Sequence, residues 1–146
     1  MSTTTRSVSA TPEQVWEVLA DGWLYPLFVV GASRMREVDE TWPAPGSKLH
    51  HSVGVWPLII DDETEVTESE PLRTLALRAK AWPLLGEAPV VLHLSEKGAG
   101  TRVVMEEDVA TGPGKLVPQP VRAPGITWRN TEALRRLAFI AEQRQA

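Results

Sequence analysis

"SKLHHSVGVWPLIIDDETEVTESEPLRTLALRAKAW", residues 47–82, is the stretch that decides the fold. It holds three strand-like segments, 47–56, 58–70 and 73–82, and apolar residues alternate with polar ones in the first and the third. Alternation with a period of two is typical of strands that bury one face. Proline separates these segments at Pro57 and Pro71, where it cannot continue a strand ladder. Strands joined by short turns form an antiparallel meander, and the stretch lacks the strand–helix alternation that would favour a parallel sheet.

Strand-like segments on both sides extend this meander. Residues 33–40 precede it, and residues 90–96 and 101–110 follow it, joined by a hairpin turn, KGAG, at 97–100. Residues 3–9, near the N-terminus, also alternate loosely. The sequence therefore predicts an antiparallel sheet of about seven strands.

Two short helical segments follow the first predicted strand. In ATPEQVWEVLADG, Thr11 is a good N-cap, Pro12 suits the first helical position, and Gln14 completes a capping-box pattern. The next stretch, WLYPLFVVGA, contains Pro26, which limits it to a short, broken helix or a tight bend. These segments predict two short helices between the first strand and the rest of the sheet.

A long helix is predicted at the C-terminus, from about Ile126. One stripe at helical spacing gathers its apolar and small residues with one amide: Ile126, Asn130, Ala133, Leu134, Leu137, Ala138 and Ala141. The preceding residues, 111–125, are rich in Pro and Gly and predict a long loop of a kind that often covers a site. The whole order predicts an α+β fold, in which a curved antiparallel sheet wraps around the long C-terminal helix.

The composition fits a single domain over residues 1–146. The chain is 42% hydrophobic and 23% charged, which is enough for a substantial core. Its net charge of -4 argues against nucleic acid as a partner, because phosphate binding needs a basic face. The absence of cysteine from the sequence excludes disulfides, thiol metal ligands and a thiol nucleophile.

The sequence predicts neither a membrane span nor an export signal. Its apolar runs fall short of the roughly 20 residues that cross a bilayer. The N-terminal MSTTTRSVSA lacks the apolar core of a signal peptide. A cytoplasmic location is therefore expected, and the oligomeric state stays open, with a homodimer compatible with the sequence.

Several stretches resemble one superfamily: ATPEQVWEVLADGWLYPLFVVGA, PGSKLHHSVGVWP, GTRVVMEEDV and NTEALRRLAFIAEQ. Together they are similar to the START/polyketide cyclase-like superfamily, SRPBCC, over nearly the whole chain. This resemblance implies the helix-grip fold, with a deep, mostly apolar cavity between the sheet and the last helix. The superfamily includes ligand carriers, aromatases and cyclases, ring-hydroxylase domains and chaperone regulators. It has no universal catalytic motif, so the resemblance assigns no catalytic residue.

Strand alternation predicts which side chains face that cavity. In the strand at 47–56 the apolar face is expected inside: Leu49, His51, Val53 and Val55. His50 is then expected to point to solvent. Three further sources add to these candidates: inward residues of other strands, the aromatic residues after the first helix, and the start of the last helix. The candidate ligand-binding residues are Trp23, Tyr25, Phe28, His51, Val53, Leu77, Met105, Glu107, Trp128 and Asn130.

His51 and Glu107 are the candidates for catalysis. Histidine titrates near working pH, so His51 could act as a general acid or base. The alternative is a core histidine that is hydrogen-bonded to a neighbour. Glu107 could be the partner of His51, a buried acid, or a strand-end residue in water. Asn130 could orient a ligand carbonyl, or it could satisfy nearby backbone groups.

The acidic run DDETE, residues 61–65, is not expected to bind a metal. In a strand, Asp61 and Glu63 point away from Asp62, whereas a calcium site needs oxygens that converge from a defined loop. The sequence also lacks the GxSxG, HExxH, P-loop and GxGxxG motifs. Neither a metal nor a cofactor is therefore expected.

Three functions stay open on the sequence. The first is binding of a small hydrophobic molecule, aromatic or polyketide-like, whose burial in the internal cavity supplies most of the affinity. The second is an enzyme of cyclase or dehydratase type in the same cavity, where His51 or Glu107 moves a proton while apolar walls exclude water. The third is a protein-interaction module that resembles the chaperone-regulator branch, with a filled core and no ligand.

Overall fold

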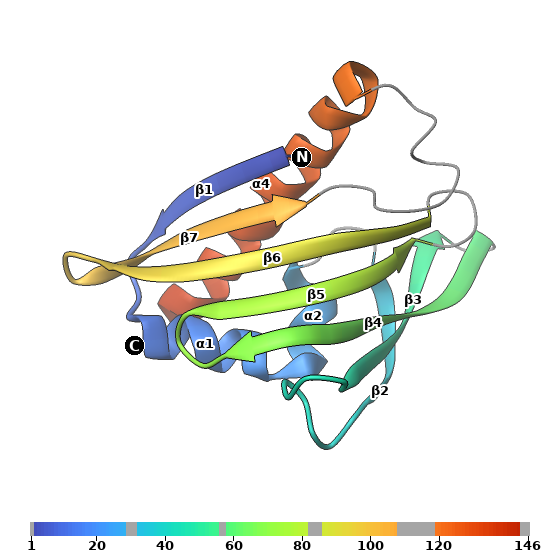
Figure 1. Ribbon diagram of the computed structural model, residues 1–146, viewed down its shortest axis with the longest axis horizontal. Helices are drawn as coiled ribbons and strands as arrows, with labels where there is room; N and C mark the ends of the chain where they lie inside the picture. The colour runs from blue at the N-terminus through green and yellow to red at the C-terminus, as the bar shows by residue number, and fades with distance from the viewer. Residues whose placement is uncertain (1, 29–31, 56–57, 82–85, 108–118, 144–146) are drawn as a thin grey trace.

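The computed structural model describes residues 2–28, 32–55, 58–81, 86–107 and 119–143 (Figure 1). Side chains are described in these ranges except at 2, 32–34, 53–55, 58–62, 80–81, 86–88 and 119–126. The elements are β1 (Ser2–Val8), α1 (Pro12–Ala20), η1 (Gly22–Leu24), α2 (Tyr25–Phe28), β2 (Ala32–Val38), β3 (Lys48–Val55), β4 (Leu58–Glu70), β5 (Thr74–Ala81), β6 (Gly86–Lys97), β7 (Gly100–Glu107) and α4 (Gln119–Gln143). This order of strands and helices is the predicted one.

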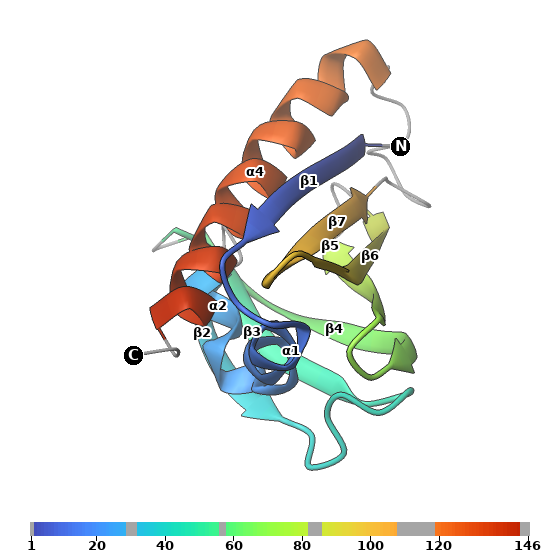
Figure 2. The same cartoon turned by 90° about the vertical axis from the view of Figure 1, so that its left-hand side faces the viewer.

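The strands of the described chain form one antiparallel sheet of seven, in the order β1-β7-β6-β5-β4-β3-β2. Strands β2 to β7 pair as consecutive hairpins, as the meander predicted. β1 joins the far edge by pairing with β7, so that Thr4 lies opposite Met105 and Val8 opposite Thr101. α4 crosses behind the sheet in Figure 1 and lies along one side of it in Figure 2. The predicted α+β helix-grip fold is thereby confirmed.

The predicted start of the first helix is present in atomic detail. The Gln14 backbone N–H donates to the Thr11 hydroxyl at 3.2 Å, and the Gln14 side-chain oxygen accepts from the Thr11 backbone N–H at 2.8 Å. Pro12 occupies the first turn, where a missing N–H costs nothing. The helix then buries the apolar residues that the spacing assigned to its inner face: Val15, Val18 and Leu19.

α4 begins at Gln119, well before the start that the sequence predicted near Ile126. The loop predicted over 111–125 is therefore wrong in its last part, while its first part, 111–118, lies outside the described residues. The physical reason is that Pro120 falls in the first turn, where backbone N–H groups have no helical partner and proline is tolerated. Within the described ranges, no helix, α4 included, is long and apolar enough to cross a membrane.

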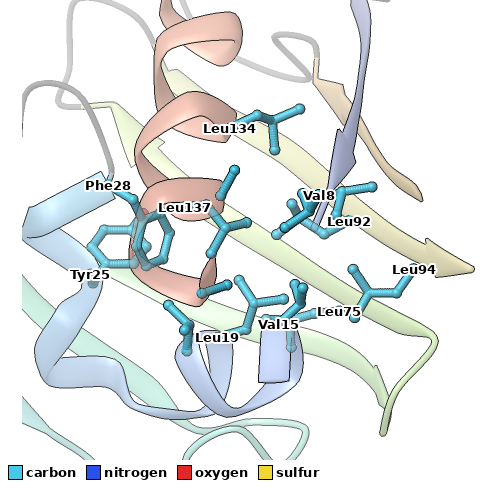
Figure 3. Close-up of a cluster of buried hydrophobic side chains, with 14 of the residues drawn as sticks. Val8, Val15, Leu19, Tyr25, Phe28, Leu75, Leu92, Leu94, Leu134 and Leu137 are labelled. Atoms are coloured by element: carbon cyan, nitrogen blue, oxygen red, sulfur yellow. The ribbon is translucent and has the colours of Figure 1, made fainter. Parts of the chain in front are cut away.

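The core lies between the concave face of the sheet and α4, with α1 and α2 packed against α4 (Figure 3). The predicted stripe of α4 is buried at Asn130, Ala133, Leu134, Leu137, Ala138 and Ala141. The sheet contributes Leu49, Val66, Leu75, Leu77, Val90, Leu92, Leu94 and Val103. The residues that alternation places on the inner face of the sheet therefore pack against the buried stripe of α4 in one apolar layer, as the sequence predicted.

Candidate ligand-binding site

The alternation of β3 brings His51 to the concave face of the sheet. His51 is 3% exposed, and Leu49, two residues earlier, is fully buried. His50, between them, is only half-buried and belongs to the convex face. β2 has two irregularities in its register against β3, whereas β3 pairs with β4 without a shift. The irregularities therefore leave the predicted orientation of His51 unchanged.

His51 belongs to a buried polar group with Thr64 of β4 and Tyr25 of α2. The Thr64 hydroxyl lies 2.9 Å from His51 Nε2 and 3.3 Å from the Tyr25 hydroxyl. The Tyr25 ring stacks on the imidazole, with centroids 5.4 Å apart and planes inclined by 26°. Phe28 meets Tyr25 edge-on, with a centroid separation of 5.8 Å. Two hydroxyl groups and one imidazole thus lie next to each other among apolar side chains. We call this set, Tyr25, His51 and Thr64, the His51 group.

Thr64 is a residue of this group that the sequence analysis did not single out. It pairs with Leu49 across β3 and β4, so the two side chains lie on the same face of the sheet. Thr64 is fully buried and Val66, two residues later, is 1% exposed. Alternation carried back from Val66 through the acidic run would have placed Thr64 inside, between two outward glutamates.

A second buried polar group lies on the same concave face but toward the other edge of the sheet, where β7 meets α4. Glu107, the last residue of β7, is 4% exposed and forms an ion pair with Arg129 of α4. Asn130, the next residue of α4, is 1% exposed, and Thr4 of β1 is 9% exposed. In the part of the chain that the structure describes, Glu107 Oε2, Asn130 Nδ2 and Thr4 Oγ1 are buried without a hydrogen-bond partner. We call this set, Thr4, Glu107 and Asn130, the Glu107 group.

The partner of Glu107 differs from the one that the sequence suggested. His51 was considered, but Glu107 Oε1 accepts a hydrogen bond from Arg129. Three strands separate β7 from β3 in the order of the sheet, so the two candidate proton-transfer residues belong to different polar groups. Sequence alone could not pair Glu107 with Arg129, because the contact depends on how α4 crosses the sheet.

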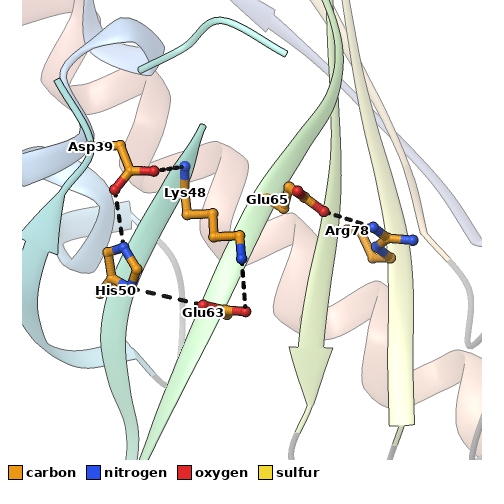
Figure 4. A network of polar contacts seen from close by, with 6 residues as sticks. All are labelled: Asp39, Lys48, His50, Glu63, Glu65 and Arg78. Carbon is orange, nitrogen blue, oxygen red and sulfur yellow. Dashed lines mark hydrogen bonds and ion pairs between the residues drawn. The ribbon is translucent and has the colours of Figure 1, made fainter. Parts of the chain in front are cut away.

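Glu63 and Glu65 of β4 lie on the convex face, in a network with basic residues of neighbouring strands. Figure 4 draws its members: Asp39, Lys48, His50, Glu63, Glu65 and Arg78. Glu63 lies 3.5 Å from Lys48 Nζ and 3.8 Å from His50 Nδ1. The His50 ring, 3.0 Å from Asp39, and the Lys48 backbone N–H hold the pKa of Asp39 below its usual value. Among the described residues, no group of three or more ligating side chains could hold a metal ion.

A hollow of about 580 Å³ lies outside the core, between the end of α1 and the β2–β3 connection. It is lined by Glu17, Ala20, Asp21, Gly22, Trp23, Val38, Asp39, Glu40 and Trp42. This hollow is acidic and open to solvent, so it differs from the apolar cavity that the sequence predicted. That cavity stays a prediction, and residues 56–57, 82–85 and 108–118 lie outside the described part of the chain.

The structure places the candidate ligand-binding residues in three environments. The buried ones are Tyr25, Phe28, His51, Leu77, Glu107 and Asn130, and Met105 is half-buried. Trp23 and Trp128 are 58% and 66% exposed. The side chain of Val53 lies outside the described ones. The buried candidates therefore gather around the His51 group and the Glu107 group, on the two sides of the concave face.

A family model described as "Polyketide cyclase / dehydrase and lipid transport" matches residues 2–142 of the chain. Among solved structures, a protein from Rhodobacter sphaeroides is 26% identical with a TM-score of 0.71, and the match covers 97% of this chain and 91% of that chain. No protein of curated function matches the chain in sequence.

Two further solved structures have the same fold at lower identity. The di-domain ARO/CYC StfQ from the steffimycin biosynthetic pathway is 12% identical with a TM-score of 0.76, over 98% of this chain and 50% of that chain. Ara h 8.0201 is 11% identical with a TM-score of 0.72, over 97% of this chain and 96% of that chain. At these identities the likeness shows the fold alone, and it agrees with the predicted superfamily.

Proposed function

The chain belongs to the family described as polyketide cyclase / dehydrase and lipid transport, and we propose that it binds a small apolar molecule between the concave face of the sheet and α4. The family description and the printed name of StfQ support an aromatic or polyketide-like molecule. The observation that carries the proposal is the His51 group, a buried set of polar tips in an otherwise apolar wall. Sites for small ligands have this composition, since apolar walls supply affinity and a few polar groups fix orientation.

In this proposal the buried candidates have distinct roles. Tyr25 and His51 orient a polar atom of the ligand beside Thr64. Phe28, Leu77 and Met105 supply apolar contact, with Val53 as a further candidate on β3. Apolar surface removed from water contributes roughly 25 cal/mol per Å². The exposed Trp23 and Trp128 stand apart from this lining.

The proposal is tested by native mass spectrometry of protein purified from its own host, followed by titration with 1-anilinonaphthalene-8-sulfonate. We expect a retained small molecule and saturable binding of the dye at one site. The chain contains two phenylalanines, which give a matched pair of variants. Phe28 is 8% exposed beside Tyr25, and Phe139 is 61% exposed on α4. Phe28→Leu should weaken dye binding several-fold, whereas Phe139→Leu should leave it unchanged.

The opposite pattern would contradict the proposal. If the protein retains no molecule and the dye does not bind, the interaction-module alternative, with a filled core, is favoured. If Phe139→Leu weakens dye binding while Phe28→Leu does not, the dye binds on the solvent face of α4 and the internal site is not its location.

A cyclase or dehydratase is the second candidate function, because the position of the His51 imidazole is fixed. Its Nε2 is hydrogen-bonded to Thr64 and its ring stacks on Tyr25, so the imidazole is held in place to exchange a proton with a neighbouring group. The test is His51→Gln, incubated with the molecule recovered by native mass spectrometry. Turnover by the wild type that disappears in the variant, with binding kept, supports the enzyme. A molecule that both proteins return unchanged supports a carrier.

A further inference from the structure

The Glu107 group leaves three polar atoms buried without a partner in the described part of the chain: Glu107 Oε2, Asn130 Nδ2 and Thr4 Oγ1. Buried polar atoms in native proteins are nearly always hydrogen-bonded, because leaving them without a partner costs folding free energy. One such atom can be incidental. Three of them from three different elements, at one junction of sheet and helix, point to a group that binds there.

The strand register places the members of the Glu107 group near one another. Thr4 lies opposite Met105 on β7, and Glu107 is two residues further along the same face. Such diagonal neighbours on one face of a sheet are about 7–8 Å apart. Arg129 reaches Glu107 from α4, and Asn130 is the next residue of that helix, with its side chain fully turned inward. The hydroxyl and the carboxylate are therefore neighbours on β1 and β7, and the buried amide follows, on α4, the arginine that contacts the carboxylate.

The chemistry of the unpartnered atoms restricts what can bind. As a carboxylate paired with a guanidinium, Glu107 can only accept a hydrogen bond at Oε2, whereas Asn130 Nδ2 can only donate one. The two atoms are not hydrogen-bonded to each other, so a third group placed between them would satisfy both. A hydroxyl oxygen does this with a single atom, since it donates its own hydrogen to Glu107 and accepts from Asn130. Thr4 Oγ1 can either donate or accept, so it fits the same arrangement.

The surroundings of the Glu107 group are apolar on the side of the sheet and open toward solvent on the side of Arg129. Glu107 pairs with Val90 of β6, and Met105 pairs with Leu92, so apolar side chains continue the concave face beyond the carboxylate. The Arg129 side chain is 38% exposed, while that of Glu107 is 5% exposed. A ligand whose apolar body lies along β6 and β7 would thus bring a polar end to the Glu107 group near the surface.

We infer that Thr4, Glu107 and Asn130 bind a hydroxyl group, alcoholic or phenolic, that the apolar ligand carries at one end; this rests on the proposed function. The substrate class is therefore a hydroxylated apolar molecule, in which the hydroxyl donates to Glu107 and accepts from Asn130. Arg129 is a positioning residue, because it holds the Glu107 carboxylate through the other oxygen.

The test compares two probes that share a ring and differ in one group, 2-naphthol and 2-methylnaphthalene, each titrated by displacement of 1-anilinonaphthalene-8-sulfonate. We expect the wild type to bind the naphthol about tenfold more tightly, the effect of one or two hydrogen bonds to a charged and a neutral partner. Asn130→Leu should lower the ratio of the two affinities a few-fold by weakening naphthol binding alone, since the hydrogen bond to Glu107 remains. Thr4→Val should lower the same ratio by a smaller factor. Thr5→Val, exposed on the other face of β1, should leave the ratio unchanged.

Stability separates a binding role from a structural one. Replacing a buried polar group that has no partner by an apolar group of similar size is nearly neutral or stabilising. Thr4→Val and Asn130→Leu should therefore unfold at or above the wild-type temperature while the affinity ratio falls. If Asn130→Leu does not fold, the ratio measured with Thr4→Val decides.

Three results would overturn the inference in different ways. Equal affinity of the wild type for both probes, unchanged in Asn130→Leu, means that the Glu107 group binds water only, and the proposed apolar site survives. Binding of neither probe contradicts the hydroxyl site and the proposed function together. A ratio that falls equally in Thr5→Val would show that the loss is not specific to the Glu107 group.

Discussion

At the scale of single residues, Thr64 connects the two other members of the His51 group. It is fully buried, and its one hydroxyl serves both His51 and Tyr25. Thr64→Val keeps the shape of the side chain but removes a hydrogen-bond partner from each of these residues. We expect the free energy of unfolding to fall by about 1–3 kcal/mol, measured by urea denaturation near neutral pH.

The control for this prediction is Thr5→Val, which makes the same chemical change at an exposed position of β1. Surface substitutions of this kind change stability by about 0.5 kcal/mol or less. If Thr64→Val and Thr5→Val unfold at the same urea concentration, the Thr64 hydroxyl does not contribute to the stability of the protein.

Glu132 on α4 predicts an effect of acid on stability. Hydrogen bonds from Arg135 and Arg136 lower the pKa of Glu132 from its ordinary value of 4.5 to about 2. Because the folded-state pKa is the lower one, this contribution is fully present above about pH 4.5 and is lost as the pH falls toward 2. Glu132→Gln should flatten the decline of the unfolding temperature over that range, and added salt should weaken the wild-type effect, since the pair is exposed.

The control variant for the acid range is Glu96→Gln, at an exposed position of β6. It should follow the wild-type curve. If the unfolding temperature declines equally in wild type and Glu132→Gln as the pH falls, the charges of Glu132, Arg135 and Arg136 contribute nothing to stability in solution.

Whether a side chain points inward or outward was predictable from the sequence wherever local periodicity determines it. Alternation placed His51 inside and His50 outside, and helical spacing placed Asn130 in the buried stripe. The contact between Glu107 and Arg129 was not predictable, because it joins two elements whose relative position no local pattern contains. Trp128, predicted as a ligand contact at the start of the last helix, is largely exposed, since a large aromatic residue indicates burial only on average.

At the scale of elements, the pairing of β1 with β7 depends on the absence of a side chain at Gly100. A Cβ there would stand far too close to the backbone oxygen of Val8, which cannot move aside as a side chain could. We expect Gly100→Ala to lower the free energy of unfolding by roughly 1–3 kcal/mol. Hydrogen exchange should show the loss of protection first in β1, which is the edge strand.

A matched variant for Gly100→Ala is Ala99→Ser, at the exposed neighbouring position of the same hairpin. It should leave both stability and the exchange of β1 unchanged. Full protection of β1 in Gly100→Ala would show that the first strand can shift without cost, against the close approach seen in the structure.

The elements also show where sequence patterns are ambiguous. The capping box at Thr11 and the boundaries of β4 were predictable, because cap residues and turn prolines act locally. The start of α4 was not, because prolines and a glycine before Ile126 are typical of a loop: Pro120 is compatible with the first turn of a helix, whereas Pro124 and Gly125 are unfavourable in the second. The contacts of α4 with β1, α1 and α2 help to stabilise such a start, and they are tertiary contacts.

At the scale of the whole molecule, the meander and the terminal helix leave one face on which a ligand can be enclosed. The convex face carries an ion-pair network, while the described side chains of the concave face are mostly apolar and include the His51 group and the Glu107 group. The order of strands, the curvature and the covering helix followed from the sequence through periodicity and the family resemblance. The separation of the polar residues into two groups did not, because it depends on the strand order and on the crossing of α4.

Binding between the two layers should stabilise the whole fold, since the ligand would contact the sheet and α4 at once. At a free ligand concentration of about 100 times Kd, linkage gives roughly 2.7 kcal/mol. For a domain of this size that corresponds to a rise in Tm of about 5–10 °C. We expect 2-naphthol to produce a saturable rise of this order, with increased amide protection in both β7 and α4. Phe139→Leu, on the solvent face of α4, should show the same rise, whereas a rise that disappears in Trp23→Ala would place the probe in the acidic surface hollow and contradict an internal site.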